Sequence, residues 1–307
     1  MKIAIIGRTE ILLETAELLL KQGYSIPLVI TAKEAPEYKK NVQDFRAFSG
    51  DIGATFIQTP RILNAFDSIL KLSPIDISVS MNYVDIIPQK IIDCFRLGVL
   101  NVHGGDLPRY RGNACQAWAI LNGEKHIGLC IHRMIGGELD SGDIITREYL
   151  AIDYNMKITQ VLQWMSERVP FLSLEAVEKL KQDPHYVLER QSKDPKDSLR
   201  CYPREPGDAR IDWNRSNLQI LRLINASNKP YSGAYCEYKG KKLIIWDAEL
   251  VEDGEDFFAV PGQVTKINSG VVEVATVGGK LRLKEVEYAG ELKSPSQIIG
   301  SIRERLK

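Results

Sequence analysis

Short apolar runs alternate with helix-like stretches over the first ~150 residues, and this alternation constrains the fold more than any other feature. The runs "KIAIIG", "IPLVIT" (26–31), "ATFIQT" (54–59) and "IDISVS" (75–80) are typical of buried strands. Helix-like stretches separate them, including "ILLETAELLLKQG", which ends at Gly23. Strands that alternate with helices form a parallel sheet that is covered on both faces. We therefore predict an α/β fold with a Rossmann-like, doubly wound, mostly parallel sheet.

The C-terminal part of the chain has a different pattern. Beyond about residue 233 the sequence consists of short strand-like runs separated by glycine turns, such as "GQVTKINSGVVEVATVGGKLRLKEVEY". This pattern predicts a small, OB-like β-barrel domain. A helix at 157–182, interrupted by Pro170, precedes a polar stretch. We expect an N-terminal domain at 1–185, a linker and helix at 186–232, and the barrel at 233–307.

Charge and cysteine content exclude several classes of protein. Forty basic and forty acidic residues cancel, so we do not expect nucleic acid to be held by overall charge. Five cysteines without a CxxC pair, with only four histidines, predict reduced thiols and no metal site. No apolar run approaches the ~20 residues of a membrane span, and "MKIAIIGRTE" is too short for a signal peptide. We expect a cytoplasmic protein without a membrane partner, and the lone Gly7 in "IGRTE" predicts no dinucleotide.

The stretch "VLNVHGGDLPRYRG" places two polar side chains at the end of a buried strand. Asn101 and His103 are two residues apart, so on a strand they point to the same face. Ligands of parallel sheets bind beyond the carboxyl ends of the strands. An amide can donate a hydrogen bond to a developing oxyanion, and an imidazole can move a proton near neutral pH. The pair is consistent with either a catalytic edge or a cap of the following turn, and the spacing alone leaves both open.

A carboxylate would complete this pair, and the turn "GGELDSGD" offers Glu138, Asp140 and Asp143. An amide, an imidazole and a carboxylate suit acyl transfer to an amine. A serine or cysteine nucleophile is unnecessary if the amine attacks directly. The remaining histidines receive no role: His126, His132 and His185.

Together, "NVHGGDLPRYRG" and "ELDSGD" resemble the signature of the folate-dependent formyltransferases. The resemblance extends to "GDARIDWN" and "NKPYSGAYCEYKG", which are similar to the start of that family's C-terminal barrel. It implies that an amine attacks the formyl group of 10-formyltetrahydrofolate, without a metal, in a catalytic domain at 1–185. By position, Asn101 would stabilise the oxyanion, His103 would move the proton, and Asp140 would support the histidine.

The resemblance also implies a pterin pocket built from the backbone of residues 82–87 and 134–140. The implied cofactor-binding residues are Tyr83, Asp85, Ile86, Ile87, Met134, Ile135, Gly136, Gly137 and Glu138. Compared with similar family members, one additional residue lies between His103 and Asp140, in "IGGE".

The family formylates several amines, and the chain length together with "IDW" argues against glycinamide ribonucleotide. Enzymes that act on methionyl-tRNA resemble this chain in length, but carry a basic, glycine-rich insertion after the second strand. Here that place holds "TAKEAPEYKKNVQDFR", which has balanced charge and no glycine. We expect a nucleotide-linked amino sugar, such as a UDP- or dTDP-4-amino sugar. The alternatives are methionyl-tRNA formyltransferase, a hydrolase of 10-formyltetrahydrofolate and a non-catalytic folate-binding protein; a homodimer is left open.

The loop after His103 is the expected substrate loop. Arg109 and Arg111 lie on a Gly/Pro-rich turn, which suits either a phosphate or a solvated surface, and we expect at least one to bind a diphosphate. The expected substrate-binding residues are Gly105, Arg109, Tyr110, Arg111, Asn113, Gln116 and Trp118. Aminoarabinose formyltransferases have an arginine where this chain has Asn113, so the sugar is left open.

Overall fold

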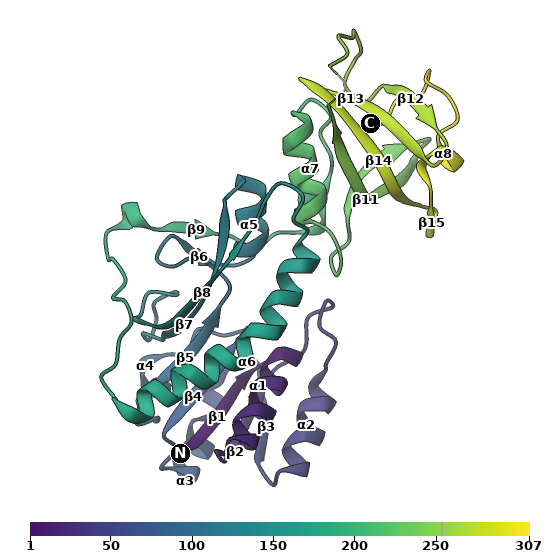
Figure 1. The fold of residues 1–307 in the computed structure, drawn as a ribbon. Helices are drawn as coiled ribbons and strands as arrows, with labels where there is room; N and C mark the ends of the chain where they lie inside the picture. The colour runs from purple at the N-terminus through teal and green to yellow at the C-terminus, as the bar shows by residue number, and fades with distance from the viewer. Residues whose placement is uncertain (253) are drawn as a thin grey trace. The chain divides into compact units, whose positions relative to one another are not determined.

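The computed structural model describes residues 1–252 and 254–307, which form two compact units (Figure 1). The first unit comprises Met1–Cys115, Ile127–Leu150 and Gln163–Tyr202. The second unit comprises Gln116–His126, Ala151–Leu162 and Pro203–Lys307. Each unit has its own sheet and its own hydrophobic core.

The first unit is built on a seven-stranded sheet in the order β3-β2-β1-β4-β5-β7-β8. Its strands are β1 (Lys2–Gly7), β2 (Ser25–Thr31), β3 (Thr55–Gln58), β4 (Ile77–Met81), β5 (Val99–His103), β7 (His126–Arg133) and β8 (Ile144–Ala151). The pairs among β1 to β5 are parallel, and β7 runs antiparallel to β5. The predicted Rossmann-like, mostly parallel sheet is confirmed.

Helices lie between these strands along the chain, and the last of them follows β8. They are α1 (Glu10–Lys21), α2 (Val42–Asp51), α3 (Phe66–Leu72), which follows the 3-10 turn η1 (Ile62–Ala65), α4 (Gln89–Ile92), α5 (Cys115–Asn122) and α6 (Ile158–Gln182). Helix α2 was not predicted, because the charged stretch after β2 shows little apolar periodicity. A capping box between Asn41 and Asp44 starts this helix, and Phe45 is its main buried side chain.

Helix α6 differs from the expectation, because it continues through Pro170 rather than being interrupted there. A proline inside a helix removes one backbone hydrogen bond. Val169 and Leu172, which lie on either side of Pro170, are buried in the first unit. The Thr146 hydroxyl of β8 donates to the Leu172 carbonyl at 3.2 Å. This packing accounts for the helix continuing despite the lost bond.

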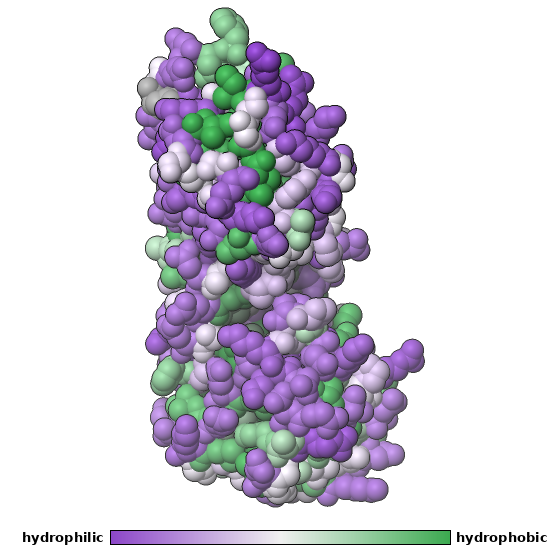
Figure 2. Space-filling model, turned by 90° about the vertical axis from the view of Figure 1, so that its right-hand side faces the viewer, coloured by the Kyte–Doolittle hydropathy of each residue, from purple (hydrophilic) through white to green (hydrophobic). Residues whose placement is uncertain are grey.

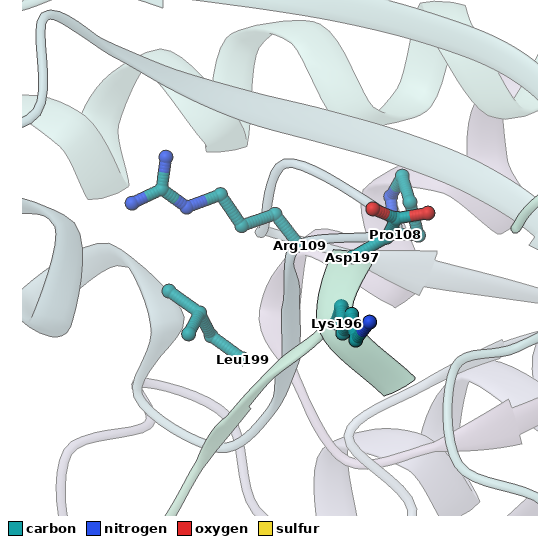
Figure 3. A pocket seen from close by; sticks show the side chains of 5 residues that line it. All are labelled: Pro108, Arg109, Lys196, Asp197 and Leu199. Atoms are coloured by element: carbon teal, nitrogen blue, oxygen red, sulfur yellow. The ribbon is translucent and has the colours of Figure 1, made fainter. Parts of the chain in front are cut away.

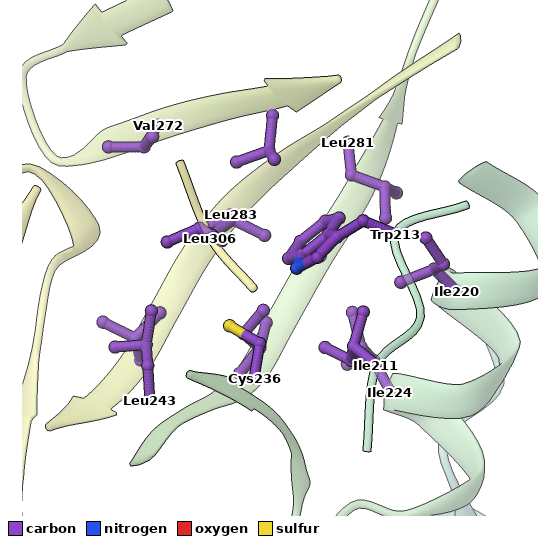
Figure 4. Packing of buried hydrophobic residues seen from close by; sticks show 14 of the residues in the cluster. Ile211, Trp213, Ile220, Ile224, Cys236, Leu243, Val272, Leu281, Leu283 and Leu306 are labelled. Carbon is purple, nitrogen blue, oxygen red and sulfur yellow. The ribbon is translucent and has the colours of Figure 1, made fainter. Parts of the chain in front are cut away.

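The second unit contains an antiparallel sheet in the order β10-β11-β14-β13-β12, and β15 pairs with β14. Its elements are η3 (Pro206–Ala209), α7 (Asn217–Ala226), β10 (Ala234–Tyr238), β11 (Lys241–Val251), β12 (Val264–Asn268), β13 (Val271–Thr276), β14 (Gly279–Tyr288), β15 (Glu291–Lys293) and α8 (Pro295–Ile298). This arrangement confirms the small barrel-like domain. The "IDW" residues Ile211 and Trp213 are buried, and Figure 4 shows the Trp213 indole between the strands and α7.

Hydrophilic side chains cover most of the face shown in Figure 2, with hydrophobic ones distributed among them. In the part of the chain that the structure describes, no helix is both long and apolar enough to cross a membrane.

Candidate active site

Strand β5 carries the two polar side chains that the sequence singled out. Val99, Leu100 and Val102 are buried in the sheet, which fixes the strand and turns Asn101 and His103 to one face. The neighbouring strand β7 pairs Asn101 with His132. Two histidines and an amide therefore lie close together.

Asp140 reaches the same place from the loop between β7 and β8. The Asn101 Nδ2 donates to Asp140 Oδ1 at 3.1 Å, and His103 Nδ1 lies 3.5 Å from Asp140 Oδ2. The backbone of Asp140 is left-handed, with φ +49°, which is uncommon outside glycine. The structure thus brings the three predicted catalytic residues together, with Asn101 and His103 both in contact with Asp140.

The Asp140 loop is held by groups that the sequence analysis did not identify. The Gly112 N–H donates to Asp140 Oδ2 at 2.9 Å. The buried Gln191 amide donates to the carbonyl oxygens of Asp140 at 2.9 Å and Gly142 at 2.6 Å. Gln191 lies in a stretch expected to be a polar linker, and its partners are about fifty positions away, so no local pattern marked it.

This environment keeps Asp140 ionised. Burial of the carboxyl group opposes ionisation, but the charge of His103, the contacts with His132 and the Gly112 N–H favour it. The balance holds the pKa of Asp140 well below its usual range. Asp140 is therefore a carboxylate at neutral pH and can support a proton on a neighbouring imidazole.

Both ring nitrogens of His103 face acceptors. Its Nε2 lies 2.7 Å from the Tyr110 carbonyl oxygen, while Nδ1 faces Asp140. The Cys115 Sγ is 3.7 Å from Nε2, and the residue His103 is only 7% exposed. Proton transfer to or from a bound amine therefore requires Nε2 to exchange the Tyr110 carbonyl for that amine.

The close packing around Gly105 leaves no room for a side chain. A Cβ on this residue would lie 2.5 Å from His103 Nε2 and 2.5 Å from the Tyr110 carbonyl oxygen. Real Cβ atoms essentially never come that close, so only glycine permits the contact between His103 and Tyr110.

His132, which received no role from the sequence, is in direct contact with the site. Its Nε2 lies 3.2 Å from Asn101 Nδ2 and 3.5 Å from Asp140 Oδ1. Its Nδ1 lies 2.8 Å from the Arg133 carbonyl oxygen, and the residue is 1% exposed. A lone histidine on an apolar strand gives no sequence signal for this role, because the contact depends on the β5–β7 register.

The second of the two segments expected to hold a pterin contacts Gln89, which lies two residues beyond the end of the first segment. The Gly136 N–H donates to Gln89 Oε1 at 2.9 Å, and a Cβ on Gly136 would lie 2.2 Å from the Gln89 nitrogen. The Met134 N–H donates to the Val99 carbonyl at 2.8 Å, which joins this segment to β5. Glu138 accepts a hydrogen bond from Ser141 at 2.6 Å, within the same turn that contains Ile135.

Side chains of the other segment are engaged within the fold. The Tyr83 hydroxyl donates to the Thr59 carbonyl at 2.6 Å, and Asp85 accepts from the Ile62 N–H at 3.0 Å. Ile87 is part of the core, whereas Ile86 is 60% exposed. Backbone groups and an exposed apolar side chain are thus what this segment can offer to a flat ligand.

The substrate loop forms β6 (Tyr110–Gly112), which pairs with β9 (Leu199–Cys201). An open groove of about 530 Å³ lies here, between the loop and the 3-10 turn η2 (Pro195–Asp197) (Figure 3). Its lining residues are Pro108, Arg109, Lys196, Asp197 and Leu199. The groove therefore carries two cationic side chains, on separate segments, and one carboxylate.

The other expected substrate residues have different surroundings. Arg111 Nη2 donates to Gln191 Oε1 at 2.9 Å and to the Ser192 carbonyl at 3.1 Å, so this guanidinium supports the Asp140 loop. The Asn113 N–H donates to the Cys201 carbonyl, and the Tyr110 side chain is buried. Two further expected residues, Gln116 and Trp118, lie on α5 within the second unit.

A mostly parallel α/β sheet with an amide, an imidazole and a carboxylate at one strand end defines an enzyme of the acid–base type. Two family models match the chain: "Formyl transferase" over residues 1–173 and "Formyl transferase, C-terminal domain" over residues 204–299. The chain belongs to the formyl transferase family.

The names of similar proteins refer to two kinds of substrate, methionyl-tRNA and amino sugars. A methionyl-tRNA formyltransferase of Clostridium tetani is 29% identical, over 99% of this chain and 96% of its own. Among solved structures, the sugar 3N-formyl transferase WlaRD, in the presence of dTDP and 5-N-formyl-THF, has a TM-score of 0.68 at 18% identity, covering 95% and 98% of the two chains. An N-formyltransferase from Helicobacter canadensis, in complex with folinic acid and dTDP-3-aminofucose, has a TM-score of 0.67 at 16% identity, covering 92% and 99%.

Proposed function

We propose that this formyltransferase moves the formyl group of 10-formyltetrahydrofolate to the amino group of a nucleotide-linked amino sugar. The family supports formyl transfer, and structural neighbours that bind formylated folates support this donor. In this proposal the exposed Ile86 and the backbone of residues 134–138 contact the flat pterin ring of the folate.

In this proposal the amine nitrogen attacks the formyl carbon, and the bond from that carbon to N10 of the folate breaks. Asn101 donates its amide N–H to the carbonyl oxygen, which gains negative charge as the new bond forms. His103 accepts the proton that the amine loses and later returns it to the leaving nitrogen of the folate. Asp140 stays ionised and stabilises the protonated imidazole.

The observation that carries the choice of a sugar over tRNA is the loop between β2 and α2. Glu34 accepts a hydrogen bond from the Val42 N–H at 3.3 Å, and Lys40 forms an ion pair with Asp44 at 3.1 Å. Residues 31–46 contain four basic and three acidic side chains, so this segment has little net positive charge. A tRNA acceptor stem requires several uncompensated cations, because phosphate contacts dominate its affinity.

The groove beside the substrate loop supports a phosphorylated substrate. Arg109 and Lys196 both line it, and a diphosphate is recognised by such cations. Arg109 takes the diphosphate-binding role in this proposal because it lines the groove, whereas Arg111 donates to Gln191 and Ser192 beside the Asp140 loop.

Methionyl-tRNA is the second candidate substrate, and the curated relatives favour it. The relatives from Clostridium tetani and Acetivibrio thermocellus both carry that name, at 29% and 27% identity, and both match nearly the whole chain.

A formylation assay with 10-formyltetrahydrofolate tests the choice. A panel of UDP- and dTDP-linked amino sugars is compared with charged initiator methionyl-tRNA under the same conditions. We expect product only with a nucleotide sugar. Formyl-methionyl-tRNA alone would overturn the proposal in favour of the second candidate. Release of tetrahydrofolate at the same rate without any amine would instead identify a hydrolase.

A further inference from the structure

Arg147 on β8 is a cationic side chain that the proposed mechanism does not use, although it is only 12% exposed. Taking a guanidinium out of water costs free energy unless its N–H groups find acceptors. A buried arginine therefore normally serves polar atoms that need donors. The acceptors around Arg147 include two consecutive residues of the substrate loop, Asp106 and Leu107.

The two ends of the guanidinium reach different groups. Nη2 donates to the Leu107 carbonyl oxygen. Nη1 donates to the Tyr149 hydroxyl at 2.8 Å, and that hydroxyl donates to Asp106 Oδ1 at 3.1 Å. Nη1 also lies 3.8 Å from the same carboxylate oxygen, as an ion pair. One arginine thus holds the loop at a carbonyl and, with the help of a tyrosine, at a carboxylate.

This part of the substrate loop lies directly on strands β7 and β8. Leu107 is 1% exposed and belongs to a small hydrophobic cluster with Cys130 and Ile144. A Cβ on Gly128 of β7 would lie 2.7 Å from the Asp106 Cα, so a side chain there would push the loop away. A carbonyl in such a place is largely closed to water and needs a donor from the protein. The guanidinium of β8 supplies that donor.

Arg147 also connects the substrate loop with the segment that holds Asp140. Its Nη1 lies 3.1 Å from Glu189 Oε2, which is a partly exposed and hence weak ion pair. The backbone of Glu189 pairs with Ile144 of β8, and Gln191, which donates to the Asp140 carbonyl, follows two residues later. Both loops of the candidate site are therefore joined to the same strand.

We infer that Arg147 is a positioning residue, which keeps the substrate loop in place beside His103. This loop contributes Arg109 to the groove and brings the Tyr110 carbonyl to His103 Nε2. Without the guanidinium, two acceptors of the loop lose their donor, and the loop opens more often. The amine then binds more weakly, whereas the folate-binding residues of the proposal lie on other segments. This inference rests on the proposed formyl transfer for its catalytic meaning, but the anchoring of the loop is a property of the protein itself.

Three substitutions test this role. Arg147→Met removes both donors and keeps an apolar stem, and Arg147→Lys keeps the charge without the two-pronged donor geometry. We expect both to raise KM for the amine that the wild type formylates by about 10-fold, with KM for folate changed less than about twofold. Tyr149→Phe removes only the hydroxyl between Arg147 and Asp106, and should raise the same KM about threefold. Arg168→Met is the control, because it removes an ion pair with Glu148, on the opposite face of β8, and should change neither KM.

Hydrogen exchange gives a readout that does not depend on the substrate. In Arg147→Met we expect the backbone amides of residues 104–110 to exchange about 10-fold faster than in the wild type, because local opening of the loop costs less. The amides of β7 should keep the wild-type rate, as should residues 104–110 in Arg168→Met.

Several results would overturn the inference. Unchanged exchange at residues 104–110 would do so, as would equally faster exchange throughout the protein, which indicates a general loss of stability. A wild-type KM for the amine in Arg147→Met or Arg147→Lys would also contradict it. If Arg147→Met does not fold, the same two measurements on Tyr149→Phe decide. A wild-type protein that formylates no amine would refute the proposed function alone, and the exchange rates would still decide the role of Arg147.

Discussion

Replacing Gly105 by alanine tests the geometry on which the site depends. The added Cβ would lie 2.5 Å from His103 Nε2, 2.5 Å from the Tyr110 carbonyl oxygen and 3.1 Å from the Cys115 Cβ. An imidazole and a backbone carbonyl cannot swing aside like a flexible chain end, so Nε2 must move by several tenths of an ångström. A misplacement approaching 1 Å costs roughly 10²-fold in rate, and overpacking costs about 1–3 kcal/mol of stability.

The assay for Gly105→Ala measures kcat at saturating folate and amine, together with thermal unfolding. We expect kcat to fall by about 10²-fold and Tm to drop by about 2–10 °C. Gly50→Ala is the matched control, because a Cβ there meets nothing within 4 Å and the residue lies in helix α2. The control should be neutral or slightly stabilising. If Gly105→Ala kept more than a tenth of wild-type kcat, the observed position of His103 would not be the catalytic one.

Five further substitutions test the assigned roles. His103→Ala should fold normally and lose about 10²–10⁴-fold in kcat, and a variant above a tenth of wild-type activity would remove this histidine from the mechanism. Asn101→Ala should lose roughly 10²–10³-fold in kcat with folate affinity little changed; a loss confined to folate binding would contradict the oxyanion role. Because the pKa of Asp140 is lowered in the folded state, its ionisation stabilises the fold at pH values above about 3.9, the usual pKa of an aspartate in an unfolded chain. This contribution to stability is lost as the pH falls. The free energy of unfolding, measured in urea from pH 5 to 3, should therefore decline less steeply in Asp140→Asn, and equal slopes would argue against the shift. Arg109→Ala should raise KM for the nucleotide sugar about 10- to 100-fold and leave KM for folate unchanged. An unchanged KM for the sugar would rule out the diphosphate-binding role of Arg109. Arg111→Ala should instead lower kcat, because Arg111 supports the Asp140 loop.

Much of the fold follows from local patterns in the sequence. The strands at 26–31 and 75–80 were predicted because β-branched, apolar runs between helices have few alternatives in a protein of this size. Helix α2 was missed because its start depends on a polar capping box rather than on apolar periodicity. The continuity of α6 through Pro170 was also missed, since tertiary packing can outweigh a lost backbone hydrogen bond.

In the site, the sequence by itself determined what lies on one strand. Asn101 and His103 were found because a two-residue spacing on a strand puts two side chains on one face, and the family signature pointed to Asp140. Only the tertiary structure decided the rest. His132 meets Asn101 through the register of antiparallel strands, and Gln191 holds the Asp140 loop from about fifty residues away. Such contacts are set by how distant segments pack, and no spacing along the chain encodes them.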